Sequence, residues 1–207
     1  MKLTSFRRGL FVATVAILPL VMLQGCGGGA KVTRVDPNTT IDLSGRWNDA
    51  DSRLVSDEMI ADLLGKPWLV QFTQKKSKNP AIICGSIRNK SMEHIAAGAF
   101  VKDIERAMVN SGSVTVVASP EERGEVRDER IDQRANADPE TVKRMGMELG
   151  ADYMLIGEIN QITDSQGKDQ VRYYQVDLTL IDIQTNVKSW IGQKKIKKFI
   201  GRSSVKP

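Results

Sequence analysis

The fold is decided by residues 81–118, AIICGSIRNKSMEHIAAGAFVKDIERAMVNSGSVTVVA. The apolar run Ala81–Arg88 predicts a strand that is buried on both faces and therefore central in a sheet. Apolar residues at helical spacing follow over Ile95–Ser111, and Gly112 is a suitable residue just past a helix end. Val114–Ala118 then predicts a second buried strand. A strand, a helix and a strand in this order predict a right-handed parallel crossover.

Helical patterns flank this unit on both sides. Upstream, Asp49–Leu64 has apolar residues at helical spacing, and Pro67 can open a short second helix. Downstream, Ser119 as N-cap, a proline at the first helical position and acids in the first turn predict a helix over residues 120–136. Residues 138–140, Asp-Pro-Glu, repeat this start for a helix that closes at Leu149.

Three strands end the chain, over Asp152–Ile162, Val171–Asp182 and Val187–Phe199, and hairpin-like connections join them. The order predicts an α/β fold: a mixed sheet with helices packed on it, built as β-α-β-α-α and then an antiparallel three-strand meander. We expect one globular domain over residues 41–200, followed by a basic tail at 201–207.

The amino-acid composition excludes several classes of function. The chain has 30 Lys and Arg against 25 Asp and Glu, but residues 1–25 hold three bases and no acid, so 27 bases face 25 acids in the rest. That balance does not indicate a nucleic-acid binder. Two cysteines and one histidine exclude disulfide scaffolds and cysteine-rich zinc modules. No phosphate-binding glycine loop, C-x-x-C, H-E-x-x-H or G-x-S-x-G pattern occurs, so we predict no catalytic residue, cofactor, metal or small-molecule substrate.

The first 25 residues predict a signal peptide, because a short basic segment precedes the apolar run Gly9–Leu23, which is short for a membrane-spanning helix. The run ends in Leu23-Gln-Gly-Cys26, which resembles a bacterial lipobox and implies lipid attachment to Cys26. The alternative is an ordinary secretory signal with an incidental cysteine. Residues 26–40 would be the lipidated cysteine and a short tether, and Gly27 favours the outer membrane by the enterobacterial sorting rule. The other cysteine, Cys84, is interpreted as a small buried hydrophobe.

Two charged segments are unusual. In the helix expected over residues 120–136, acids and arginines gather on opposite sides and leave no apolar stripe, so we expect it to bury little. The last twenty residues carry seven bases and no acid. Two interpretations stay open for them: lysines that protect an edge strand from pairing, or contact with anionic lipid or an acidic partner.

Two clusters of uncommon residues are candidate binding sites. One, SGRWND, covers Ser44–Asp49, and the other, RNKSMEH, covers Arg88–His94 in the loop after a strand, where α/β folds usually place function. Trp47 either anchors a partner or packs on the core, and Asn89 and Ser91 either bind or form the turn. The candidate partner-binding residues are Arg46, Trp47, Asn48, Arg88, Asn89, Lys90, Glu93 and His94.

These clusters and several other segments resemble the LpoB-type outer-membrane lipoprotein activators of penicillin-binding proteins. The matching pieces, in order behind the lipobox, are Trp47-Asn48, Ile87–Ser91, Asn110–Gly112, Val114–Ser119, Leu149–Tyr153 and the pattern Leu-x-Leu-Ile-x-x-x-Thr-x-x-x-x-Trp-x-Gly at 178–192. The resemblance implies a TolB amino-terminal-like fold. It also implies a non-catalytic lipoprotein on the periplasmic side of the outer membrane that binds the small non-catalytic domain of a class A penicillin-binding protein.

Well-known members carry a long proline-rich tether, whereas this chain has about fourteen tether residues. Either the synthase therefore reaches outward or the partner differs. Two other functions stay open. One is a structural subunit of an envelope or secretion assembly, like the curli-type relatives, and the other is an envelope hydrolase that depends on His94 or on paired acids.

Overall fold

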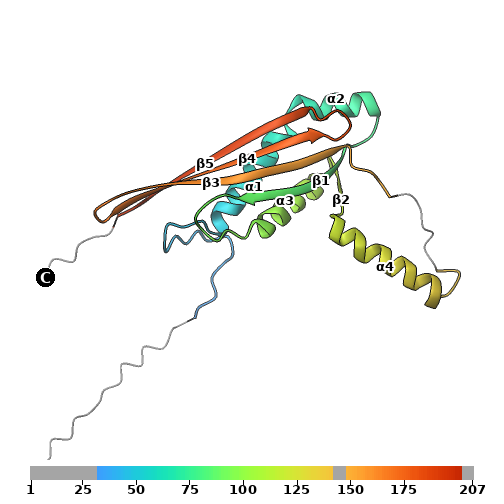
Figure 1. Ribbon diagram of the computed structural model, residues 1–207, viewed down its shortest axis with the longest axis horizontal. Coiled ribbons are helices and arrows are strands. Elements are labelled where there is room, and N and C mark those ends of the chain that lie inside the picture. Colours follow the sequence, from blue (N-terminus) through green and yellow to red (C-terminus); the bar gives the residue numbers. More distant parts are fainter. Residues whose placement is uncertain (1–31, 142–147, 202–207) are drawn as a thin grey trace, which may run out of the picture. The chain divides into compact units, whose positions relative to one another are not determined.

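A computed structural model describes residues 32–141 and 148–201 of the protein (Figure 1). The described elements, in chain order, are α1 (Asp49–Leu64), α2 (Pro67–Lys76), β1 (Ala81–Asn89), α3 (Ala97–Ser111), β2 (Thr115–Val117), α4 (Pro120–Asn136), β3 (Tyr153–Gln166), β4 (Asp169–Asp182) and β5 (Lys188–Ile200). They belong to one compact unit that starts at Pro37. The signal peptide, Cys26 and most of the basic tail lie outside the described residues, as do residues 142–147 of the helix predicted to close at Leu149. The described residues of that segment, 138–141 and 148–149, are not helical.

The five strands form one mixed sheet in the order β2-β1-β3-β4-β5. Strand β1 pairs in parallel with β2 on one side and with β3 on the other. The last three strands form the antiparallel meander. The predicted parallel pairing and the closing meander are therefore confirmed. The first strand has a partner on each side, as predicted, but it is second rather than central in the sheet. It is buried at Ala81–Ile83 and not along both faces, because Ser86 and Arg88 are exposed.

Helices α1 and α3 cover one face of this sheet (Figure 1). The expected apolar stripe of α1 is buried, and Val55 and Leu63 are fully enclosed. In α3, Phe100, Ile104 and Met108 of the stripe are also fully buried, and Val101 is partly buried. Opposite them, the strands supply alternate inward side chains; the fully enclosed ones include Ile82, Leu155, Ile159, Tyr174, Val176, Leu178 and Leu180.

The segment Val114–Ala118 differs from the prediction. Its strand, β2, has three residues and is half-buried rather than buried. The reason is topological, because β1 lies between β2 and β3 and leaves β2 at the edge of the sheet with a single partner. An apolar run predicts a strand, but it does not say how many neighbours that strand will have.

The connection predicted over Thr163–Gln170 is also wrong. The ladder between β3 and β4 continues through Asp164↔Val171 to Gln166↔Asp169, so only Gly167 and Lys168 form the turn. The strand ends are polar and exposed, which hides them from a search for apolar alternation. Gly167 has a positive φ of 61°, a conformation that glycine adopts without steric cost.

Helix α4 confirms the predicted start and charge pattern. Ser119 and Glu122 form a capping box around Pro120 at the first helical position. No residue of α4 is buried, and its two large apolar residues, Val126 and Ile131, are exposed. The helix therefore gains little from packing, and its ordered contacts are ionic, such as the pair between Lys102 and Glu122.

Cys84 is partly buried on β1 and packs against the core. Burial, with a smaller effect from Glu105, raises the pKa of its thiol to about 12. We expect the native protein to react with a disulfide reagent at about pH 8 roughly a thousandfold more slowly than the urea-unfolded chain, from the thiolate fraction alone. Equal rates in the two states would contradict the buried-hydrophobe interpretation.

Candidate functional site

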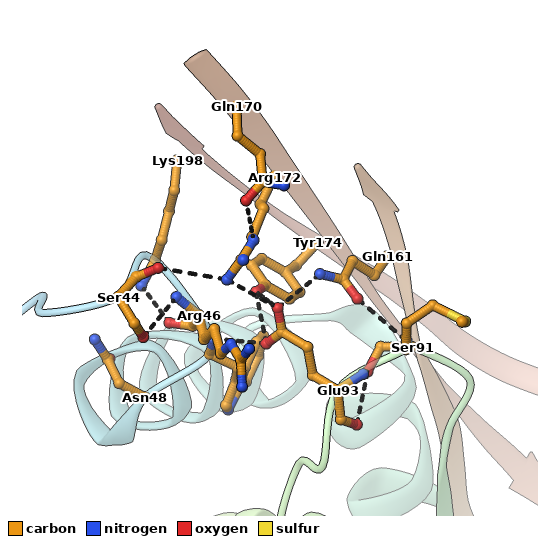
Figure 2. Close-up of polar contacts among 12 residues, drawn as sticks. Ser44, Arg46, Asn48, Ser91, Glu93, Gln161, Gln170, Arg172, Tyr174 and Lys198 are labelled. Atoms are coloured by element: carbon orange, nitrogen blue, oxygen red, sulfur yellow. Dashed lines mark hydrogen bonds and ion pairs between the residues drawn. The ribbon is translucent and has the colours of Figure 1, made fainter. Parts of the chain in front are cut away.

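The fold brings the two sequence clusters together at one end of the sheet. The backbone N–H of Trp47 donates a hydrogen bond to Oε2 of Glu93 over 3.1 Å, although the residues are 46 positions apart. We call the group formed by Trp47, Glu93, Gln161, Arg172 and Tyr174 the glutamate joint (Figure 2). It fastens the segment before α1 and the loop between β1 and α3 onto strands β3 and β4.

Glu93 is the centre of this joint. Its carboxylate accepts a hydrogen bond from the Tyr174 hydroxyl, 2.9 Å from each oxygen, and one from Gln161 Nε2 at 2.8 Å. Arg172 lies 3.2 Å from Oε1, and the two side chains are only 15% and 11% exposed. Burial, followed by the hydrogen bond to Glu93, raises the pKa of Tyr174 well above its ordinary value, so this hydroxyl acts as a fixed donor.

Asn89 and Ser91 shape the loop that carries Glu93. Asn89 Nδ2 donates to the Glu93 carbonyl at 2.7 Å, and Asn89 Oδ1 accepts from the backbone and the hydroxyl of Ser91. These bonds replace regular secondary structure over a tight turn. Of the two roles considered for Asn89, the structure shows the turn-forming one.

Trp47 and Asn48 are likewise tied to the fold. The Trp47 ring is half-buried and makes edge contacts with Phe100 and Tyr174, and its Nε1 donates to Ser52. Asn48 is the N-cap of α1 and completes a capping box with Asp51. Both residues therefore have structural duties that do not require a partner.

The remaining four candidates are solvent-exposed and lie on two sides of the sheet. Arg46 and His94 line a hollow of about 250 Å³ beside the glutamate joint, on the helix-covered side. Arg88 and Lys90 reach Glu158 on the other side, at 3.8 Å and 2.6 Å, and Arg88 borders a separate hollow there. The sequence clusters thus contribute to two surfaces rather than to one.

Sequence reasoning missed the strand residues of the joint. Arg172 and Tyr174 occupy the same alternating face of β4 as the buried Val176. Polar groups that continue an inward-facing alternation were the available signal, because a buried polar side chain needs a partner. The identity of that partner, Glu93, was not readable from spacing.

The part of the chain that the structure describes, residues 32–141 and 148–201, holds no group of three or more histidine, cysteine, aspartate or glutamate side chains placed to bind a metal ion. None of its helices has the length and apolar character needed to span a bilayer.

Fold and site together define a class: an α/β domain with a five-stranded mixed sheet, helices on one face, and a buried hydrogen-bonded joint between its loops. The sequence also assigns the protein to a family. Residues 51–196 match the family described as peptidoglycan-synthase activator LpoB, and the chain belongs to that family. Membership gives it a general role as an activator of peptidoglycan synthesis, which is a regulatory role.

Solved structures similar to this chain include members of the same family. The LpoB C-terminal domain from Escherichia coli is 15% identical, with a TM-score of 0.43, over 72% of this chain and 99% of that one. The NMR structure of E. coli LpoB is 13% identical, with a TM-score of 0.39, over 93% and 96%. Lipoprotein GNA1162 from Neisseria meningitidis is 17% identical, with a TM-score of 0.39, over 61% and 88%. At these values the likeness carries no argument about function. No curated protein sequence matches the chain.

Proposed function

We propose that this protein binds a class A penicillin-binding protein and stimulates its synthesis of peptidoglycan, as a lipoprotein anchored through Cys26 to the periplasmic side of the outer membrane. The observation that carries the proposal is the match of residues 51–196 to the synthase-activator family. The lipobox Leu23–Cys26 supports the anchor. The same match favours an activator over the assembly subunit or the hydrolase.

Activation requires a difference in affinity. A bound protein shifts a synthase toward its active conformer only if it binds that conformer more tightly than the inactive one. No reacting group is needed on the activator for this effect. A rigid surface suffices, and hydrogen bonds from Asn89 and Gln161 to Glu93 tie the loop that carries His94 to β1 and β3.

We place the contact on the exposed residues of the two clusters. Arg46 and His94 project beside the glutamate joint, and Arg88 and Lys90 project from the opposite side of the sheet. Arginine is a frequent anchor of protein interfaces. Trp47, Asn48, Asn89 and Glu93 would then serve binding indirectly, because they position the exposed residues.

The test follows glycan polymerisation from lipid-linked precursor by the class A synthase of the same organism, in detergent, with soluble residues 27–207. We expect stimulation, and we expect Arg46→Ala/His94→Ala to raise the concentration for half-maximal stimulation about tenfold, as for a pair of interface anchors. Lys75→Ala/Lys76→Ala, on the exposed end of α2, is the matched control and should behave like the wild type.

Two other outcomes are informative. Normal stimulation by the Arg46/His94 variant together with loss in Arg88→Ala/Lys90→Ala would move the contact to the other side of the sheet. Neither stimulation nor binding by the wild type would discard the synthase as partner.

A further inference from the structure

The sheet face turned away from the helices carries an apolar and basic patch near the β3–β4 turn. Register places Ile162, Tyr173 and Lys197 in one row across β3, β4 and β5, with Val171 and Phe199 beside it and Lys195 one row further on. We call these six residues the basic apolar patch. On β4 and β5 the patch residues alternate with Tyr174 and Lys198, whose side chains face the helices. The patch residues therefore point to the sheet face that is turned away from the helices.

The apolar members of this patch are open to solvent. Ile162 is 66% exposed and Phe199 is 70% exposed, and they flank the half-buried Tyr173 and Val171. Scattered single apolar residues are ordinary on protein surfaces, but a contiguous group indicates a contact surface.

The two lysines of the patch differ from their neighbours on β5. Lys194 pairs with Glu58, and Lys198 pairs with Asp42 and Asp51, all on the helix side. Within the described residues, Lys195 and Lys197 make no ion pair. Asp164 lies in the row of Val171 and Phe199, and Asp169 lies beside the turn with Lys168. The rows of Lys197 and Lys195 hold no acid, and the next acids on this face, Glu158 and Asp177, lie one row beyond Lys195. The inner rows are therefore positively charged next to apolar side chains.

This combination suits a membrane surface. Long lysine side chains lie along apolar surface while their ammonium groups reach anionic headgroups, and Tyr and Phe favour the boundary between headgroups and acyl chains. A protein partner that fitted the patch would need acids placed opposite both lysines. An anionic bilayer meets that requirement at any position along its surface.

The chain also brings this end of the domain close to a bilayer. Residues 37–47, the lead-in segment, are fixed to the inner side of the same strand ends: Asp42 lies 2.7 Å from Lys198 Nζ, and the Ser44 carbonyl accepts from Arg172. Asp42 follows Cys26 by sixteen residues. As a coil, such a segment spans about 22 Å, and fully extended it spans at most about 55 Å.

We propose that the basic apolar patch rests on the anionic phospholipid surface of the membrane that holds the lipid anchor. The proximity argument rests on the proposed anchoring at Cys26, whereas the chemistry of the patch does not. Docking through this face turns the helix-covered side, with Arg46 and His94, away from the membrane and toward the periplasm. Arg88 and Lys90 lie on the membrane-facing side, so the two proposals together leave Arg46 and His94 as the residues that reach the synthase.

The experiment measures vesicle binding by soluble residues 27–207, so that the lipid anchor contributes nothing. The buried core of the described fold runs from Val55 to Trp190, so removing residues 1–26 leaves it whole. Cosedimentation uses vesicles of equal parts phosphatidylethanolamine and phosphatidylglycerol, and vesicles of phosphatidylcholine as the neutral comparison. We expect binding to the anionic vesicles only, weakened at least about tenfold by Lys195→Glu/Lys197→Glu and about tenfold by Phe199→Ser.

Lys75→Glu/Lys76→Glu on α2 is the matched control, because it changes the net charge equally at another exposed site. It should keep binding within about twofold. No binding by the wild type, or equal loss in the control, would overturn the proposal.

Synthase stimulation in detergent separates this proposal from the preceding one. Lys195→Glu/Lys197→Glu should stimulate normally there, whether or not it binds vesicles. If the variant keeps vesicle binding but loses binding to the synthase, the patch is a protein contact and the membrane proposal is wrong. Circular dichroism confirms that each exposed substitution leaves the fold intact.

Discussion

Replacing Glu93 with alanine should lower the free energy of unfolding by about 3 kcal/mol, the low end for breaking an enclosed ion pair from one side. The change strands the Tyr174 hydroxyl, the Arg172 guanidinium and the Trp47 N–H, all of which point at the lost carboxylate. Unmet buried donors are costly because water cannot replace the missing acceptor. Urea denaturation, followed by far-ultraviolet circular dichroism, measures the loss.

Glu93→Gln is the first control for this effect. Its amide keeps one acceptor oxygen but removes the charge that faces Arg172, so we expect roughly half the loss. Met92→Ala is the second control, since the adjacent Met92 side chain is 97% exposed and should change stability by less than about 0.5 kcal/mol. A Glu93→Ala protein as stable as Met92→Ala would contradict the role assigned to the glutamate joint.

Lys198→Met, made in the otherwise wild-type protein, should lower the free energy of unfolding by about 3 kcal/mol. The Lys198 side chain is 11% exposed and lies 2.6 Å from Asp51, which is itself 8% exposed. Methionine keeps the apolar stem but leaves the Asp51 carboxylate enclosed with only the capping box around it. It also removes the ion pair of Lys198 with Asp42, which keeps, within the described residues, only its hydrogen bond from Asn48.

The neighbouring Lys197→Met is the matched control, because it removes the same charge from the outward side of the same strand. It should shift the urea midpoint very little. Equal shifts for the two variants would show that net charge, rather than the enclosed pair with Asp51, sets the stability.

The pH dependence of the Lys198 effect follows from its pKa. Burial disfavours the charged amine, but the hydrogen bonds to Asp42 and Asp51 outweigh that effect and raise the pKa above its ordinary value. Because the pKa of Lys198 is raised in the folded protein, its charged form adds to the free energy of unfolding. This contribution is fully present below the unfolded-state pKa of about 10.4 and is lost as the pH rises through the folded-state pKa. The difference between wild type and Lys198→Met should therefore stay constant from neutral pH to about pH 9 and shrink only at stronger alkali.

Most helices and strands were predictable from the sequence because local physics determines them. The N-cap at Ser119 and the apolar stripe of α1 are properties of a few neighbouring residues, and each is confirmed. The parallel unit was equally readable, because a strand, a helix and a strand allow few connections. The edge position of β2 was not readable, since it depends on which strand takes the second side of β1.

The same distinction between local and long-range determinants applies to the candidate site. The sequence by itself determined that Arg46–Asn48 and Arg88–His94 are unusual, and it determined the family to which the chain belongs. Only the tertiary structure decided that Glu93 is an enclosed acceptor for Tyr174, and that Lys198 rather than Lys197 faces the helix-covered side of the sheet. Burial and pairing depend on which distant segments meet, and a spacing of 46 or 81 residues leaves no periodic signal in the chain.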